Sequence, residues 1–293
     1  MIKLGQLVDD RYRINARIGS GGMAEVYEAN DIITRKVVAF KILKEEVANK
    51  QNIARFEHEA RAVAALNHPN IVLLLNTGTY DGLPYIINEY IKGQTLRDVL
   101  DFRGALPQSE VCDIMLQLTS AVEHAHSRGV LHCDIKSTNV FLEPDGTIKL
   151  ADFGLAVIGR EKKSENDKTI AGSVHYLAPE LSKGIRPSKQ SDIYALGVLF
   201  FELMTSKLPF EEKTKYDTAL AHVRKAFPSL HKYLPNAPKS LERIILKATR
   251  KNPYDRYESV QLMHDDIQRV VDAKQVKRKK TILERIFGFK SED

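Results

Sequence analysis

Two oxygen-bearing side chains lie on either side of a predicted hairpin near the middle of the chain. Asn139 directly precedes a short apolar run, Asp152 closely follows a second one, and a Pro-Asp-Gly turn at residues 144–146 separates the runs. Because such a turn between apolar runs is typical of a hairpin, both side chains should lie at its open end. A carboxylate and an amide oxygen held side by side suit Mg²⁺, which takes oxygen ligands. Asp134 and Lys136 are on the preceding loop; an ordinary polar loop that caps a hairpin is the alternative.

A glycine-rich segment near the N-terminus could bind phosphate. It runs from Ile18 to Val26, and three of four consecutive residues are glycine: Gly19, Gly21 and Gly22. Glycines let backbone N–H groups approach phosphate oxygens without a Cβ in the way. Residues 25–29 alternate like a strand, whereas a Walker A or dinucleotide-binding loop would lead into a helix. A hairpin folded over a nucleotide fits better than either of these, and a plain tight hairpin is the alternative.

A lysine interrupts the apolar strand predicted over residues 37–43. Burying Lys41 there is unfavourable unless its ammonium is paired; an edge-strand lysine that reaches water is the alternative. Glu59 is flanked by Phe56 and Val63 on the apolar side of the next predicted helix. The two residues would explain one another as an ion pair that aims the Lys41 ammonium at phosphates.

The elements that must position these residues change in character along the chain. Strand-like segments come first, with one helix among them: strands within 11–43, a helix at 52–66, and strands at 71–75 and 85–90. Helical periodicity dominates beyond Gly93, over residues 95–102, 109–127, 192–205, 216–226, 239–249 and 258–272. This pattern predicts an α+β fold, with a small, mostly β lobe over residues 1–91 and a larger, mostly α lobe over residues 92–273.

Composition excludes several classes of protein. Hydrophobic residues make up 43% of the 293 and charged residues 28%, so the chain is not disordered, collagen-like or coiled-coil. Two cysteines, Cys112 and Cys133, are too few for a disulfide framework and predict a reducing compartment. No apolar run approaches the roughly 18 residues of a membrane-spanning helix, and the N-terminus has no signal-peptide core. We expect a soluble cytoplasmic protein.

The positive charge is concentrated in a tail, residues 274–293. Within it, residues 274–290 carry seven Lys or Arg and one acid, Glu284, and this balance of +6 equals the net charge of the whole chain. The rest is about neutral and lacks the basic surface that a nucleic-acid binder needs. The tail is basic and then amphipathic. Three interpretations stay open: contact with the anionic inner face of a membrane, a juxtamembrane piece, or a solvated end.

The motifs occur together in an order that resembles the eukaryotic-like protein kinases. In sequence they are Gly-x-Gly at 19–21, Val-Ala-Phe-Lys at 38–41, Glu59, His-x-Asp-x-Lys-x-x-Asn at 132–139, Asp-Phe-Gly at 152–154 and Ala-Pro-Glu at 178–180. The resemblance covers about residues 11–271, a single bilobal kinase domain. The Gly-Gly-Met loop and Asn67-His68-Pro69 look most like bacterial kinases of the penicillin-binding-and-Ser/Thr-kinase-associated (PASTA) receptor type.

The resemblance implies a serine/threonine protein kinase of bacterial signalling that uses ATP and Mg²⁺ and also phosphorylates itself. Asp134 would accept the proton of the substrate hydroxyl and Lys136 would hold the γ-phosphate. Lys41 with Glu59 would orient the α- and β-phosphates, and Asn139 and Asp152 would ligate Mg²⁺. The residues that would surround ATP are Ile18, Gly19, Ser20, Gly21, Gly22, Met23, Val26 and Ala39, with hinge backbone groups from Glu89 and Ile91.

Three further residues take structural roles by the same resemblance. Arg256 would pair with Glu180 of the Ala-Pro-Glu segment. Asp192 begins a predicted helix that is apolar nearly all round; a plain N-cap is one interpretation, and relatives use this Asp to brace the catalytic loop.

Relatives also dimerise through the small lobe. The resemblance therefore implies a homodimer as well as protein substrates.

Two departures from the family pattern leave alternatives open. Cys133 replaces the Arg that usually precedes the catalytic Asp and binds a loop phosphate, and Asn88 replaces an apolar gatekeeper. We therefore expect little dependence on loop phosphorylation; the alternative is that Ser164 or Thr169 is phosphorylated and matters. A pseudokinase that binds ATP and signals by conformation is the rival function. A small-molecule kinase would share the fold but usually lacks an Ala-Pro-Glu segment.

Overall fold

The computed structural model describes residues 2–153 and 174–287, apart from the side chains of Arg55, His58, Glu59 and residues 274–287. The chain forms two compact units, one from Met1–Asp98 and His124–Gly172, the other from Val99–Glu123 and Ser173–Asp293. The first unit contains strands and helices, and the second is helical. The predicted lobe boundary after residue 91 stays a prediction. Among the described helices, none is long and apolar enough to cross a bilayer. Neither Cys112 nor Cys133 forms a disulfide.

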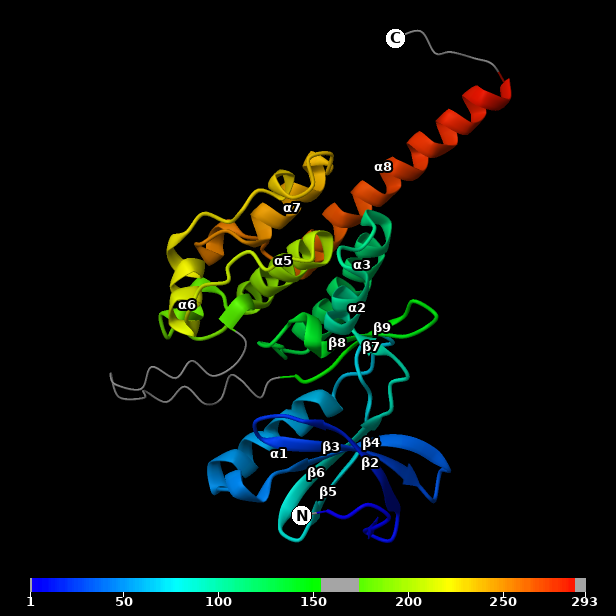
Figure 1. The fold of residues 1–293 in the computed structure, drawn as a ribbon, viewed down its shortest axis with the longest axis vertical. Helices are drawn as coiled ribbons and strands as arrows, with labels where there is room; N and C mark the ends of the chain where they lie inside the picture. The colour runs from blue at the N-terminus through cyan, green and yellow to red at the C-terminus, as the bar shows by residue number, and fades with distance from the viewer. Residues whose placement is uncertain (1, 154–173, 288–293) are drawn as a thin grey trace. The chain divides into compact units, whose positions relative to one another are not determined.

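An antiparallel six-stranded sheet dominates the first unit (Figure 1). Its strand order is β1-β2-β3-β4-β6-β5, and the strands are β1 (Leu7–Val8), β2 (Tyr12–Ser20), β3 (Ala24–Asp31), β4 (Lys36–Leu43), β5 (Leu74–Tyr80) and β6 (Leu83–Glu89). Tyr12, Phe40 and Tyr85 fill the core on one face, and the Phe40 and Tyr85 rings stack at 4.7 Å. The predicted strand at 71–75 lies further along the chain, because residues 70–72 instead bond to a second sheet.

Helix α1 (Lys50–Ala64) covers the other face of this sheet. Its start is capped by the Asn49 side chain, which accepts a hydrogen bond from the backbone N–H of Asn52. Phe56 and Ala60 on its buried side pack against Leu43 and Ile86. The 3₁₀ turn Glu45–Val47 connects β4 to the helix. Since side chains alternate along a strand, Lys41 faces the α1 side together with Leu43. Lys41 is buried there.

A three-stranded sheet completes the first unit. It consists of β7 (Gln94–Thr95), β8 (Val140–Leu142) and β9 (Ile148–Leu150), with the 3₁₀ turn Ser137–Asn139 leading into β8. The predicted Pro-Asp-Gly hairpin is confirmed: Val140 pairs with Leu150 and Leu142 with Ile148. The backbone of β9 also bonds to the segment before β5, since Val72 N donates to Leu150 O over 2.9 Å.

The second unit is helical (Figure 1). Its elements include α4 (Pro179–Ser182), α5 (Lys189–Thr205), α6 (Lys215–Arg224), α7 (Lys239–Ala248) and α8 (Val260–Phe287), with 3₁₀ turns at Val174–Tyr176, Leu230–Lys232 and Pro253–Asp255; α2 (Leu96–Arg103) and α3 (Gln108–Ser127) contribute residues to both units. Helix α5 is buried all round, as its sequence predicts. Its capping box joins Ser188 to Ser191, so the N-cap interpretation of Asp192 is wrong.

Candidate active site

The open end of the β8–β9 hairpin brings the predicted metal ligands together. Asn139 precedes β8 and its carbonyl accepts a hydrogen bond from the backbone N–H of Ala151 over 2.9 Å. Asp152 is the next residue and half of its side chain is exposed. Its φ of +59° lies in the left-handed region, as does that of Cys133 at +64°. Such conformations of non-glycine residues store strain and cluster at functional sites.

The residues of the 132–139 motif form a compact polar cluster. The Lys136 ammonium lies 2.5 Å from Asp134 Oδ2. Asn139 Nδ2 donates to the same Oδ2 over 3.0 Å and to the Asp134 carbonyl over 2.9 Å. Because the amide nitrogen of Asn139 is directed at Asp134, its Oδ1 is the atom that can coordinate a cation. The three residues therefore hold a carboxylate, an ammonium and an amide oxygen within one loop.

His132 is a further candidate site residue, to which the sequence motif by itself assigns no role. Its ring is fully buried; Nδ1 accepts a hydrogen bond from the Asp134 backbone N–H over 3.2 Å, so Nε2 carries the proton and donates to the Ala151 carbonyl over 3.0 Å. The ring also packs against Phe153 at 4.5 Å. A neutral histidine thus ties the loop of Asp134 to the segment of Asp152. Its position two residues before Asp134 was the available signal.

Lys41 reaches the same site from the six-stranded sheet. Its ammonium lies 2.6 Å from Asp152 Oδ1, and its side chain is buried. The charge of Lys41 lowers the pKa of the Asp152 carboxyl, and the hydrogen bond between them acts in the same direction. Asp152 is therefore held ionised. The predicted partner of Lys41, the Glu59 carboxylate, lies outside the described side chains, so that ion pair stays a prediction.

The glycine-rich segment forms the expected turn between β2 and β3. Gly19 pairs with Val26, and Gly21 N donates to the Ala24 carbonyl over 2.9 Å. Ile18, Gly19 and Ser20 end β2, whereas Gly21, Gly22 and Met23 form the turn. A hairpin, not a strand-to-helix loop, therefore carries the glycines.

A cavity of about 40 Å³ lies between the sheet, α1 and the hairpin. It is lined by Lys41, Ala60, Val63, Val72, Leu74, Ile86, Asn88, Leu150, Ala151, Asp152 and Phe153. Asn88 sits opposite Ala39 in the β4–β6 register, and Glu89 is the last residue of β6. The polar Lys41, Asn88 and Asp152 thus line an otherwise apolar cavity, which is smaller than an ordinary ligand pocket of roughly 300–1,000 Å³.

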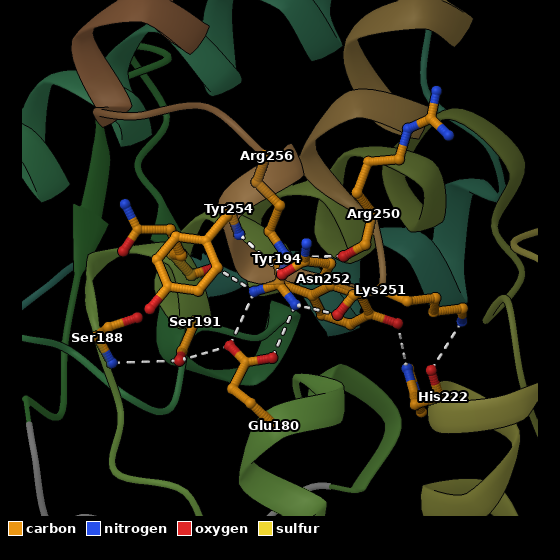
Figure 2. A network of polar contacts seen from close by, with 11 residues as sticks. Glu180, Ser188, Ser191, Tyr194, His222, Arg250, Lys251, Asn252, Tyr254 and Arg256 are labelled. Carbon is orange, nitrogen blue, oxygen red and sulfur yellow. Dashed lines mark hydrogen bonds and ion pairs between the residues drawn. The ribbon is translucent and has the colours of Figure 1, made fainter.

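The Ala-Pro-Glu segment is anchored by a buried ion pair in the second unit (Figure 2). Arg256 binds both Glu180 oxygens over 2.8 and 2.7 Å, and both side chains are almost fully buried. The remaining Arg256 N–H groups donate to the backbone carbonyls of Gln190, Arg250 and Lys251. All five guanidinium donors are therefore used. The pair implied by the family resemblance is present.

A buried histidine beside this network should make stability depend on pH. Burial lowers the pKa of His222 to about 3, and Tyr194 hydrogen-bonds its Nδ1 over 2.8 Å. Among the described residues, its Nε2 has no hydrogen-bond partner. In the unfolded chain the ring would take up a proton near pH 6.5. The unfolded state then binds more protons, so stability is lost as the pH falls from 6.5 towards 3.

We expect this histidine to cost about 2 kcal/mol of unfolding free energy between pH 7.5 and pH 5. Urea unfolding at both pH values, in wild type and a His222→Asn variant, measures the effect. The asparagine keeps an acceptor for Tyr194 but does not titrate, so its loss should be smaller by about that amount. Equal losses in the two proteins would contradict the assignment.

Comparison with known proteins identifies the family to which this fold belongs. The family model for the protein kinase domain matches residues 12–267, so the chain belongs to the protein kinase domain family. Serine/threonine-protein kinase PrkC of Bacillus subtilis is 41% identical over 278 residues, 94% of this chain and 43% of that protein. Probable serine/threonine-protein kinase PknB of Lactococcus lactis is 39% identical, over 91% of this chain and 43% of that protein.

A solved structure extends the likeness to three dimensions. Rad53 residues 1–466 in complex with AMP-PNP superpose with a TM-score of 0.74 at 25% identity, covering 88% of this chain and 65% of that one. The expected kinase family and bilobal fold class are confirmed. The chain spans less than half the length of the two bacterial relatives.

Proposed function

We propose that this chain is the catalytic domain of a bacterial serine/threonine protein kinase, which transfers the ATP γ-phosphoryl group to protein hydroxyls. The observation that carries the proposal is the pairing of two polar groups, Lys41 with Asp152 and Asp134 with Lys136 and Asn139. The hydrogen bond from Ala151 N to the Asn139 carbonyl joins the segments that carry them. Phosphoryl transfer needs little covalent chemistry from the protein, so positioning and charge neutralisation provide most of the rate. Two ammonium groups, two carboxylates and one side-chain amide on these segments match that requirement.

Each side chain has a task that follows from its contacts. Asp134, oriented by Asn139, accepts the proton of the attacking hydroxyl, and Lys136 beside it neutralises charge on the transferred group. Lys41 lies next to the ionised Asp152, where an ammonium can bind phosphate oxygens. Asn139 Oδ1 and the Asp152 carboxylate would hold Mg²⁺, which neutralises phosphate charge when bound. Oxygen donors beside a buried ammonium fit that ion and its nucleotide.

The nucleotide would lie between the glycine turn and the hinge. Residues 18–23 with Val26 would cover its phosphates, and Ala39 would line the adenine pocket. The backbone of Glu89 and Ile91, where β6 ends, would hydrogen-bond the adenine. Glu59 would support Lys41 from α1.

Radiolabelled ATP transfer tests the function directly. We expect Mg²⁺-dependent incorporation into the chain itself and into a generic basic protein, with phosphoserine or phosphothreonine after acid hydrolysis. A Lys41→Met variant is the inactive control. Binding of Mg·ATP without transfer would favour the pseudokinase alternative, which rests on Cys133 and Asn88. Cys133→Arg would then be the first variant to examine for recovered activity.

Loop phosphorylation is a separate part of the proposal. Since Cys133 cannot pair with a phosphate as arginine does, activity should survive phosphatase treatment. Ser164 and Thr169, the alternative sites, lie outside the described residues. Loss of most turnover after dephosphorylation, with phosphate mapped to either residue, would contradict this part.

The tail is proposed to bring the domain to the inner face of a membrane from the cytoplasm. Its seven basic residues suit an anionic surface. Co-sedimentation with phosphatidylserine vesicles should fall when residues 274–293 are deleted. Sedimentation that ignores the deletion would contradict membrane contact.

A homodimer through the small lobe is also proposed. Ile32 and Ile33 are exposed at the turn between β3 and β4, and replacing both by Ser should shift sedimentation equilibrium towards monomer. An unchanged distribution would contradict an interface at this turn.

A further inference from the structure

The Glu89 carboxylate joins three segments of the first unit. Its Oε1 accepts a hydrogen bond from the Leu73 backbone N–H over 2.9 Å and lies 2.7 Å from the Lys149 ammonium of β9. The backbone N–H of Glu89 donates in turn to the Leu73 carbonyl over 2.9 Å. The Lys149 side chain is only 14% exposed and that of Glu89 27%. This is a partly buried, geometrically specific ion pair, unlike an ordinary surface pair.

Lys149 occupies a strand whose neighbouring residues are fixed. Ile148 and Leu150 on either side of it are fully buried, and the Asn70 side chain donates to the Ile148 carbonyl over 3.0 Å. Leu150 N donates to the Asn70 carbonyl over 2.9 Å. The position of β9 along its axis is therefore set by the segment before β5. The Glu89–Lys149 pair adds a direct link from β9 to the end of β6.

A second ion pair connects the same two sheets further along. Asp152 lies three residues after Lys149, about 10 Å along an extended chain, and contacts Lys41 of β4 over 2.6 Å. Strand β4 is paired to β6, with Lys41 opposite Ile86 and Val38 opposite Glu89. The two pairs thus link the six-stranded sheet to β9 through Lys149 and to the segment just after β9 through Asp152. A displacement of β6 or β9 along its axis would strain at least one of these two ion pairs.

We propose that Glu89 and Lys149 are positioning residues, which hold the hinge end of β6 in register with the Asp152 end of β9. The inference rests on the proposed function, in which adenine binds at the hinge and the phosphates with Mg²⁺ bind beside Asp152. A nucleotide that contacts both the hinge and the Asp152 end binds more tightly when the distance between them is fixed. A nucleoside contacts only the hinge, so its affinity does not depend on that distance.

The test compares two ligands on a Lys149→Met variant. Methionine keeps an unbranched apolar stem but removes the ammonium, and Lys149→Arg is the matched control because it keeps the charge. Calorimetric titration with Mg·ATP and with adenosine gives the two dissociation constants. We expect the Mg·ATP constant of Lys149→Met to rise about tenfold and the adenosine constant to stay within about twofold. Lys149→Arg should stay within about threefold of wild type for both.

A second variant keeps the inference testable if methionine disturbs folding. Lys149→Gln keeps a polar side chain that can donate to Glu89 but loses the charge, and it should show the same split between the two ligands. An equal loss of affinity for Mg·ATP and for adenosine would indicate general damage to the hinge and would overturn the positioning role. An unchanged dissociation constant for Mg·ATP would also overturn it. A wild-type protein that binds adenosine but not Mg·ATP would instead overturn the proposed function, and the inference with it.

Discussion

Replacing Asp134 by asparagine is expected to lower the rate of phosphoryl transfer by about 10²–10⁴-fold, the usual contribution of a positioned general base. The amide keeps the size of the side chain and can still accept from Asn139, but it cannot take up the hydroxyl proton. It also leaves the Lys136 ammonium without the carboxylate that lies 2.5 Å from it. Mg·ATP binding should survive, because Lys41 and Asp152 are untouched.

Single-turnover transfer at saturating Mg·ATP measures this loss, and nucleotide titration checks that binding persists. Asp145→Asn is the matched control, since Asp145 is exposed in the turn of the same hairpin and its carboxylate accepts a hydrogen bond from the backbone of Thr147, two residues away. Its rate should stay within about twofold of wild type. An Asp134→Asn protein that retained more than a tenth of the rate would rule out a general-base role for this carboxylate.

The Arg256→Ala variant is expected to lose about 3–5 kcal/mol of unfolding free energy, the typical cost of breaking a buried ion pair. The guanidinium is fully buried and satisfies Glu180 together with three backbone carbonyls. Alanine would leave the Glu180 carboxylate buried with Ser191 as its remaining side-chain partner among the described contacts. Stabilities of 5–15 kcal/mol are usual, so the loss is a large fraction of the total.

Urea unfolding at pH 7.5 measures the loss through the transition midpoint. Arg269→Ala is the control: Arg269 also pairs with an acid, Asp266, but its side chain is 70% exposed, so its cost should be about 0–1 kcal/mol. A Glu180→Ala, Arg256→Ala double variant should lose less unfolding free energy than the sum of the single variants. Each single variant leaves one buried charge unpaired, whereas the double variant leaves none. Equal shifts for Arg256→Ala and Arg269→Ala would show that burial does not strengthen this pair.

Much of the local structure follows from the sequence alone. Strand alternation, the Pro-Asp-Gly turn and the apolar stripe of α1 are short-range patterns, so they predict the β8–β9 hairpin and the β3 and β4 strands. They also predict a helix at residues 52–66, which the structure has at Lys50–Ala64. The hairpin in turn placed Asn139 beside the Asp152 segment. Motif order supplied the rest of the predicted site and the kinase family. Boundaries were less certain, since α5 begins at Lys189 and not at Asp192.

The partners of the charged residues were decided only by the tertiary structure. Lys41 contacts Asp152 across 111 residues of chain, and no pattern within one segment encodes which distant carboxylate a buried ammonium will meet. The bridging of Asp134 and Ala151 by His132, and of β6 and β9 by Glu89 and Lys149, has the same origin. Periodicity is a property of neighbouring residues and can be read along the chain, whereas ion pairs depend on how separate sheets pack, which only the folded chain determines.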